Sequence, residues 1–402
     1  MRILIHAVAL KKAGGSSQHL ESFLAALREV SAGHEYTLCL DERYHYSGSM
    51  PPGQIVSVSG LTPAKRLWWD QVGVRRLVAK RHIDVILALL TFGATRPPVP
   101  QVNFQRTPVY YCERLLGGVG RKERAGLMLR RSLLRRVMSG SKVVVTPSAA
   151  MRDDILRVYP ELGADRFAVI PHGFDKVGFR KCLPTPDLRA AGETSSTSME
   201  RSERPFRILY VSHFLPHKGF LVLPQVARLL AERGLQVEFW FTGAQEDWPR
   251  GYRQMMADAS AFGVERCLCS LGRVPHEEIA RLYAQADLFF FPSLCESFGF
   301  PMVEAMGAGL PIAAADTAVN CEICGDAAEY FSCDDASSAA DVVGRLAGDL
   351  PRRRNLSQRA LERFETNVLD MKQYASRVLT LLEAVADESG EVARNRLGGR
   401  QE

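Results

Sequence analysis

The feature that most constrains the fold is a regular alternation of short apolar segments with amphipathic, helix-forming segments in both halves of the chain. In the first half, the segments that predict strands are residues 2–5, 36–40, 84–88, 99–104, 143–146 and 167–170. In the second half, they are residues 206–211, 237–242, 266–271, 288–291, 311–313 and 328–331. Strands that alternate with helices form a parallel sheet covered by those helices. Because 402 residues exceed what one hydrophobic core usually organises, we expect two Rossmann-like α/β domains.

Composition and cysteine usage indicate a soluble protein of a reducing compartment. Apolar residues make up 46% of the chain and charged residues 24%, and no apolar run is long enough to span a membrane. The N-terminus reads as a first strand that leads into Gly14 and Gly15, not as a secretion signal. The nine cysteines are odd in number and scattered, which argues against a disulfide framework. We therefore expect a cytoplasmic protein, and the cysteine spacing does not favour a structural zinc site.

Changes in composition along the chain predict the domain boundaries. The stretch from Cys182 to Arg204 has almost no large apolar side chains, so it cannot bury enough surface to order strongly. A long amphipathic helix begins near Met371, and the polar tail after it should be frayed. The predicted organisation is a first domain at residues 1–178, a flexible linker or surface excursion at 179–204, a second domain at 205–370, a crossover helix at 371–388 and a tail at 389–402.

The segment at residues 291–313 carries the most specific chemistry. Its apolar strand stops before Pro292, and Pro301 suits the first turn of a following helix. Glu296 then lies in the loop and Glu304 near the helix start. A carboxylate accepts two hydroxyl hydrogen bonds at once, as the diol of a ribose can offer, and the free N–H groups of a helix N-terminus suit anions and sugar hydroxyls. The pattern favours a sugar-nucleotide site, with Glu304 on the nucleotide and Glu296 on the sugar.

A plainer interpretation of the two carboxylates stays open at this point. Glu296 could cap the helix, and Glu304 could be solvated in the first turn, where the helix dipole favours a negative charge. The glycines of the same segment, Gly299, Gly307 and Gly309, indicate places where the backbone approaches a ligand or a neighbouring element closely.

The paired glutamates and their flanking segments resemble the C-terminal domain of a large retaining glycosyltransferase family, often called glycosyl transferases group 1. The flanking segments are Leu-Gly-Arg-Val at residues 271–274, Leu-Tyr-Ala-Gln-Ala-Asp at 282–287, Gly-Leu-Pro at 309–311 and Glu-Ile-Cys-Gly-Asp-Ala-Ala at 322–328. Several ordered motifs over roughly 60 residues make this similarity specific. The resemblance implies the GT-B fold, in which two Rossmann-like domains face each other across a cleft and a C-terminal helix returns to the first domain.

The resemblance also implies a donor site for a nucleotide-diphosphate sugar in the second domain. The implied catalytic residues of this domain are Glu296, Lys218 and His213. The implied substrate-binding residues are Gly243, Arg273, Val274, Ser297, Phe298, Gly299, Phe300 and Glu304. Lys218 would neutralise the leaving diphosphate. The family usually carries an arginine where this chain has His213, and because an unperturbed histidine is largely neutral near physiological pH, Lys218 would carry more of the charge.

In the first domain the resemblance points to two further positions. Gly14 and Gly15 follow the first strand and would present backbone N–H groups to the donor phosphates and the acceptor. Gln105 stands where many relatives place a histidine that contacts the sugar, so it is a candidate catalytic residue that can donate and accept but cannot titrate. Alternatively, Asn103 or Arg106 occupies that position, or Gln105 only holds the end of the strand.

The segment that begins at Arg121 and ends at Lys142 predicts a basic amphipathic helix. Its many arginines and lysines face a single acid, Glu123, and apolar side chains interleave at near-helical spacing. In a chain of net charge +6, such a helix could rest on anionic lipid, and an ordinary helix packed on the first domain is the alternative. Nucleic acid is not an expected partner, because no aromatic stacking pattern accompanies the arginines.

These features predict a glycosyltransferase that moves a sugar from a nucleotide-diphosphate donor to a hydroxyl group of a glycan or lipid-linked acceptor. The resemblance alone implies retention and a place in cell-surface polysaccharide or glycolipid biosynthesis, on the cytoplasmic side of a membrane. No Asp-x-Asp motif stands near the site, so we expect neither a metal nor a cofactor beyond the donor. Two alternatives stay open: a catalytically degenerate binding or scaffold protein, which His213 and Gln105 favour, and a nucleotide-sugar epimerase, whose acid and base cannot be placed.

Overall fold

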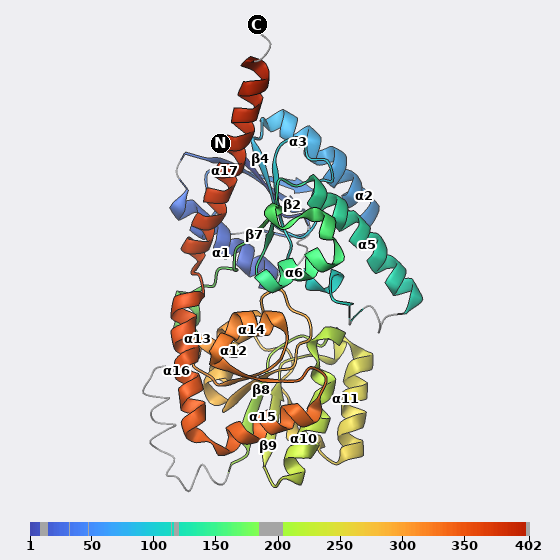
Figure 1. Ribbon diagram of the computed structural model, residues 1–402, viewed down its shortest axis with the longest axis vertical. Coiled ribbons are helices and arrows are strands. Elements are labelled where there is room, and N and C mark those ends of the chain that lie inside the picture. The colour runs from blue at the N-terminus through green and yellow to red at the C-terminus, as the bar shows by residue number, and fades with distance from the viewer. Residues whose placement is uncertain are drawn as a thin grey trace. The chain divides into compact units, whose positions relative to one another are not determined.

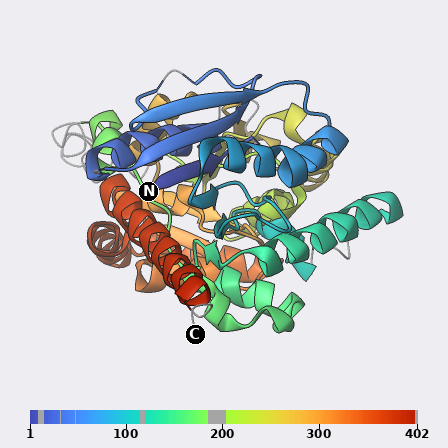
Figure 2. The ribbon, with the colours of Figure 1, turned by 90° about the horizontal axis from the view of Figure 1, so that it is seen from above.

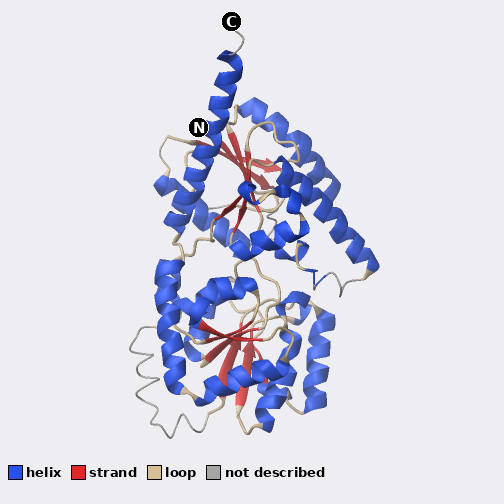
Figure 3. Ribbon diagram, in the orientation of Figure 1, coloured by secondary structure: helices blue, strands red, loops and turns tan. Residues whose placement is uncertain are grey.

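The structure is a computed structural model that describes residues 1–8, 15–31, 33–46, 48–113, 115, 120–184 and 204–398. The chain divides into two compact units (Figure 1). Unit 1 consists of Met1–Asp175 together with Leu369–Glu402, and unit 2 consists of Lys176–Val368. Both units are α/β, with strands enclosed by helices (Figure 3).

Unit 1 contains a seven-stranded sheet in the order β3-β2-β1-β4-β5-β6-β7, and every pair of neighbours is parallel. The strands are β1 (Arg2–His6), β2 (Glu35–Asp41), β3 (Gly53–Val58), β4 (Val85–Ala88), β5 (Gln101–Phe104), β6 (Val143–Thr146) and β7 (Phe167–Val169). The sequence pattern missed β3, because this edge strand alternates exposed and partly buried residues and has no continuous apolar run.

The helices of unit 1 cover this sheet. They are α1 (Gly15–Val30), α2 (Pro63–Trp68), the π-helix η1 (Trp69–Gly73), α3 (Val74–Arg81), α5 (Arg121–Gly140), α6 (Ala149–Val158) and α17 (Met371–Gly398), with short 3-10 turns at η2 (Pro108–Tyr110), η3 (Pro160–Leu162) and η4 (Ala164–Arg166). In the described residues α5 begins where the sequence predicts it, and its first half extends away from the sheet of its unit (Figure 2).

The C-terminal helix α17 belongs to unit 1, as Figure 1 shows in red. It packs along α1, and Tyr374, Val378 and Leu382 enter the same core as Phe23 and the strands. The helix begins at Met371 as predicted, but it continues to Gly398, so the predicted frayed tail from residue 389 is helical over most of its length. Residues 399–402 lie outside the described part of the chain.

Unit 2 contains a six-stranded parallel sheet in the order β10-β9-β8-β11-β12-β13. Its strands are β8 (Phe206–Tyr210), β9 (Val237–Phe241), β10 (Leu268–Ser270), β11 (Leu288–Phe291), β12 (Ile312–Ala315) and β13 (Ala328–Phe331). Its helices are α7 (Lys176–Cys182), α10 (Leu223–Glu232), α11 (Pro249–Phe262), α12 (His276–Gln285), α13 (Phe300–Gly307), α14 (Ala318–Cys324), α15 (Ala336–Gly348) and α16 (Leu350–Asn367), with 3-10 turns at η5 (Pro216–Lys218), η6 (Phe220–Val222), η7 (Gln245–Asp247), η8 (Glu265–Cys267) and η9 (Gly325–Ala327).

The predicted linker at 179–204 begins too early. Residues 176–182 form α7, and Phe179 is buried with its ring centroid 6.4 Å from that of Tyr283 on α12. An aromatic side chain buried in this way anchors the segment to unit 2, which the linker's polar composition did not reveal. Residues 185–203 of the predicted linker lie outside the described residues.

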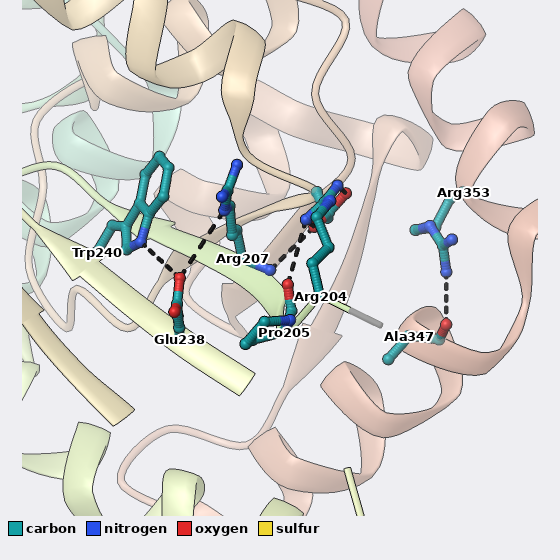
Figure 4. A network of polar contacts seen from close by, with 8 residues as sticks. Arg204, Pro205, Arg207, Glu238, Trp240, Ala347 and Arg353 are labelled. Carbon is teal, nitrogen blue, oxygen red and sulfur yellow. Dashed lines mark hydrogen bonds and ion pairs between the residues drawn. The ribbon is translucent and has the colours of Figure 1, made fainter. Parts of the chain in front are cut away.

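A polar network stabilises unit 2 at the amino ends of its strands (Figure 4). The guanidinium of Arg204 binds both carboxylate oxygens of Asp287 at 2.7 Å, just before β11. The side chain of Arg207 lies 3.8 Å from Glu238, whose other contact is the indole N–H of Trp240. These ion pairs belong to the amino ends of the strands, whereas open α/β sheets bind ligands at the carboxyl ends.

The strand order of each sheet reverses once, between β1 and β4 in unit 1 and between β8 and β11 in unit 2. Loops that leave the carboxyl ends of two such strands run in opposite directions, so a crevice forms between them where open α/β sheets bind ligands. The predicted donor residues Lys218 and Glu296 follow β8 and β11. The topology of unit 2 therefore brings these two side chains to its switch point.

Candidate active site

Lys218 and Glu296 form the centre of the site in unit 2. The ammonium of Lys218 donates to Oε1 of Glu296 at 2.6 Å, and the two side chains are only 16% and 9% exposed. The hydroxyl of Ser293 donates to the same carboxylate oxygen at 2.6 Å. Glu296 does not cap α13, whose N-cap is Gly299 without a side-chain hydrogen bond. The helix-capping interpretation of Glu296 is therefore wrong, and the carboxylate is held toward the lysine.

Gly219 explains how the two loops come so close. Its φ of +68° is left-handed, and a Cβ at this position would lie 2.0 Å from the carbonyl oxygen of Pro292. The next residues continue the contact, because the backbone N–H of Leu294 donates to the carbonyl of His217 at 2.8 Å. Only glycine permits this approach. Gly219 therefore forms the backbone turn that positions the neighbouring side chain of Lys218.

Glu304 is buried on the inner face of α13. The hydroxyl of Tyr283, from α12, donates to Oε2 of Glu304 at 2.9 Å. Burial raises the pKa of this carboxyl group to about 7, although the tyrosine hydrogen bond opposes the change. The solvated interpretation of Glu304 is therefore wrong. A carboxyl group with so few partners in a buried position gains when a ligand donates hydrogen bonds to it.

The carboxylate of Asp247 contacts residues from three loops of unit 2 at the same edge of the sheet. The carboxylate accepts from the backbone N–H of Ala244 at 3.1 Å and from Arg273 at 2.8 Å, and His213 Nδ1 lies 3.3 Å away. Burial would raise the pKa of Asp247, but these hydrogen bonds outweigh it and lower the pKa. The side chain of His213 is 76% exposed, and it contacts Asp247 rather than Glu296.

A pocket of about 450 Å³ opens beside this Asp247 cluster. It is lined by Ala244, Gln245, Glu246, Tyr252, Ser270, Gly272 and Arg273. These residues come from the loops after β9 and β10, where the sequence predicts substrate binding at Arg273 and Val274. The volume is within the range of small-ligand sites.

The remaining predicted residues of unit 2 lie in two places. Gly243 is next to the pocket, but a Cβ there would meet the ring of Phe214 at 2.7 Å, so its close approach is to a side chain of the core. Ser297, Phe298 and Gly299 form the turn before α13, in which Gly299 is left-handed at φ +81°, and Phe300 is the first residue of the helix. The rings of Phe298 and Phe300 meet edge to face at 5.3 Å.

Sequence reasoning missed three residues of this site: Asp247, Tyr283 and His217. His217 is held neutral, because burial and then the charge of Lys218 lower its pKa to about 4. Tyr283 belongs to a segment that resembles the family, but an aromatic residue in a predicted helix is ordinarily interpreted as part of the hydrophobic core. Asp247 lies in a polar run, Gln-Glu-Asp, with no pattern to separate it from an exposed turn.

In unit 1, Gln105 is fully buried, and both the nitrogen and the oxygen of its amide are hydrogen-bonded. Its Nε2 donates to the carbonyl of Thr91 at 3.0 Å and to Oδ1 of Asn103 at 2.5 Å, and Tyr111 donates to its Oε1 at 2.7 Å. These bonds favour the alternative in which Gln105 holds the strand end. Arg106, the next residue, is partly exposed.

The glycine loop of unit 1 is described only in part. Gly14 lies outside the described residues, and Gly15 is the first residue of α1. His19 on α1, His172 after β7 and Tyr374 on α17 form a buried triangle of rings, with centroids 5.0 to 6.1 Å apart. Burial, followed by the charge of Arg106, lowers the pKa of both histidines well below the usual value.

Family models match both units. The model of glycosyl transferases group 1 matches residues 193–363, and that of glycosyltransferase family 4 matches residues 13–176. The chain belongs to the group 1 glycosyltransferases. The matched regions contain the Lys218–Glu296 pair, Glu304 and the Asp247 cluster, so the motifs that resembled the family lie on the elements that build the site.

Relatives of this family member include enzymes with different products. It is 24% identical to the alpha-maltose-1-phosphate synthase of Mycolicibacterium smegmatis over 57% of this chain and 61% of that enzyme. It is 22% identical to the O-antigen chain mannosyltransferase RfbU of Salmonella typhimurium over 86% of this chain and 90% of that protein. The first match spans less than two thirds of the relative's length.

Solved structures show that the family member has the GT-B fold, as predicted. The crystal structure of Anabaena Alr3699/HepE in complex with UDP and glucose aligns with a TM-score of 0.68 and 16% identity, over 95% of this chain and 99% of that chain. At this identity the likeness shows the fold alone.

Two other features are absent from the described residues. No helix there is both long and apolar enough to cross a lipid bilayer. Within the same residues, no group of three or more His, Cys, Asp or Glu side chains is arranged to hold a metal ion.

Proposed function

We propose that the protein is a retaining glycosyltransferase that transfers a sugar from a nucleotide-diphosphate sugar to a hydroxyl acceptor in cell-surface polysaccharide or glycolipid biosynthesis. The observation that carries the proposal is the Lys218–Glu296 pair at the β8–β11 switch point, 2.6 Å apart and nearly buried. A buried ion pair is a poor way to gain stability, so its presence where open α/β sheets bind ligands favours a role in binding.

Each side chain of the pair suits one part of the donor. The ammonium of Lys218 can bind the diphosphate and neutralise charge as it leaves, and the carboxylate of Glu296 can accept hydrogen bonds from sugar hydroxyls. In the free protein these two charges satisfy each other. Bound donor replaces that contact with one partner for each, while Ser293 keeps Glu296 in place.

The nucleotide occupies the rest of the edge of unit 2 in this proposal. Glu304 accepts hydrogen bonds from the two ribose hydroxyls, and the base enters the pocket between Gln245 and Arg273. Asp247 keeps that pocket open, since it holds Arg273, Ala244 and His213 from three different loops. His213 adds a cation near the diphosphate only when it is protonated.

The transfer itself needs no covalent help from the protein. The bond between the anomeric carbon and the donor phosphate oxygen breaks, and a bond from that carbon to the acceptor oxygen forms on the same face. The acceptor's proton goes to an oxygen of the leaving phosphate, so the atoms balance without a metal or a cofactor. The protein contributes position and charge, which are large terms in catalysis.

The experiment that tests the function begins with ligand screening. Purified protein is heated with UDP, GDP, ADP and their common sugars, since a ligand at about 100 times its Kd stabilises the folded state by roughly 2.7 kcal/mol. The stabilising donor is then assayed for hydrolysis and for transfer. Binding without any turnover would instead support the degenerate binding protein, and interconversion of the sugar would support an epimerase.

We further propose that α5 contacts an anionic membrane that carries a lipid-linked acceptor. On this helix Leu129 is 73% and Met128 51% exposed, beside the exposed Arg130 and Arg136. Two residues of the predicted basic surface have other contacts: Arg131 is buried, and Arg135 pairs with Glu161 at 2.6 Å. Exposed apolar and cationic side chains on one helix suit the interfacial region of a bilayer.

A further inference from the structure

The carboxyl edge of the sheet in unit 1 contains a cation among neutral groups. Arg106 follows β5, and its charge acts on His19, His172 and Tyr374, which come from α1, the loop after β7 and α17. Burial keeps both histidines neutral and raises the pKa of Tyr374 to about 12. Arg106 is therefore the charged member of this cluster.

Among the described residues, the guanidinium of Arg106 makes no hydrogen bond or ion pair, and only the backbone N–H of Arg106 is engaged, with the hydroxyl of Thr91. The hydroxyl of Tyr374 is also buried without a hydrogen-bond partner. Three other partly buried arginines of the described residues have clear partners. Arg204 binds Asp287, Arg166 donates to Ser141, and Arg363 donates to the carbonyls of Ile323 and Glu322.

A partly desolvated guanidinium without an anion is costly for the fold, and burial lowers the pKa of Arg106 accordingly. Arg106 is nevertheless only partly buried as a residue, so a ligand at this edge of the sheet can approach it. Its planar donors match phosphate and carboxylate oxygens in pairs. The neighbouring phenol of Tyr374 can donate one more hydrogen bond to such a group.

We propose that Arg106 binds a phosphate-type anion of the acceptor at the carboxyl edge of unit 1, so that the acceptor class is a phosphorylated sugar, polyol or lipid. Assigning the anion to the acceptor rests on the proposed function, whereas the anion site itself does not. The other anion of this kind that Arg106 could bind is the diphosphate of the donor. Because Lys218 serves the donor diphosphate in unit 2, binding of the two anions responds to different substitutions.

The test measures binding of inorganic phosphate, at constant ionic strength set with chloride, by calorimetry and by thermal shift. Arg106→Gln should weaken phosphate binding at least tenfold, and Arg106→Lys should keep part of it. The control Arg157→Gln removes one equally charged side chain that is 63% exposed on α6, and it should bind phosphate as the wild type does. Without phosphate, Arg106→Gln should melt no lower than the wild type, because it removes an unpaired, partly buried charge.

Two further measurements distinguish the two anions. Nucleoside diphosphate should bind equally to the wild type and Arg106→Gln, and transfer to sugar phosphates should exceed transfer to the same unphosphorylated sugars only when Arg106 is present. Equal phosphate affinity in the wild type and Arg106→Gln, or an equal loss of nucleoside diphosphate binding, would overturn the proposal. Absence of any donor turnover by the wild type would instead refute the proposed function while leaving the phosphate measurement intact.

Discussion

Glu304 links nucleotide binding to pH. Burial raises its pKa to about 7, and two ribose hydroxyls that donate to the carboxylate would favour the ionised form. Nucleoside diphosphate affinity should therefore rise as pH increases through 7, and binding near pH 7 should release protons. Glu304→Gln should weaken binding by roughly 1–3 kcal/mol and abolish this pH dependence. Calorimetry in buffers of different ionisation enthalpy measures both; a pH-independent wild type would remove Glu304 from the ribose site.

The same carboxyl group predicts how stability varies with pH in the absence of ligand. Its pKa is raised from the ordinary value of 4.5 to about 7, so between these values the folded state binds more protons than the unfolded state. The stabilisation is complete below the unfolded pKa and is lost as pH rises through about 7. Glu304→Gln should lose less stability between pH 5 and 8 than the wild type, whereas the exposed control Glu278→Gln should follow the wild type in thermal melts.

Gly219 provides a test of the backbone contact that places Lys218. Gly219→Ala should destabilise the protein by more than about 1 kcal/mol, because it combines a left-handed φ with a Cβ 2.0 Å from the Pro292 carbonyl. Gly234→Ala is the matched control, since Gly234 has a φ of +78° and no atom within 4 Å of its Cβ. Chemical denaturation gives both values. Equal losses would mean that the loop contact contributes nothing.

The sequence indicated candidate site residues where a charged side chain follows a strand. It did not indicate those whose contact partners are distant in the sequence. The strand-to-helix pattern predicted Glu296 as a site residue and the resemblance predicted Lys218, and the structure brings the two side chains within 2.6 Å of each other. Asp247 and Tyr283 were missed, because their roles depend on which loops and helices the fold brings together. Gln105 shows the same limit, since only the structure reveals that Asn103, Thr91 and Tyr111 hydrogen-bond to its amide.

At the scale of elements, buried strands were predictable and the edge strand β3 was not. Central parallel strands are covered on both faces and read as continuous apolar runs, whereas β3 is half exposed. The helix α7 was likewise hidden in a polar stretch, because a single buried ring, Phe179, fixes it. Helices with a strong amphipathic pattern, α5 and α17, began close to their predicted positions.

The proposed membrane contact is a prediction about one element. Replacing Arg130 and Arg136 with glutamine should reduce sedimentation with anionic liposomes severalfold at low salt and leave donor hydrolysis unchanged, since each cation contributes roughly 1 kcal/mol near such a surface. The double variant of Arg250 and Arg253, exposed on α11, carries the same net charge as the control. Added salt should mimic the α5 substitutions. Wild-type protein that ignores anionic liposomes would end the membrane claim.

For the whole molecule, two α/β domains were predictable because their signal repeats along the chain. The resemblance added the GT-B topology, with the last helix in the first unit, which local patterns alone do not give. The boundaries between the two units lie at residues 175–176 and 368–369. The sequence predicts that the first domain ends at residue 178 and the second at residue 370. These positions depend on which core each flanking side chain enters, so composition locates them only approximately.

The central claim is that Lys218 and Glu296 separate on donor binding and serve its diphosphate and its sugar. The most direct measurement compares turnover of the stabilising nucleotide sugar with affinity for its free nucleoside diphosphate, in the wild type, Glu296→Gln and Lys218→Ala. Glu296→Gln should lower turnover at least tenfold with unchanged nucleoside diphosphate affinity, and Lys218→Ala should lower both. Wild-type turnover in Glu296→Gln, or wild-type nucleoside diphosphate affinity in Lys218→Ala, would contradict this claim.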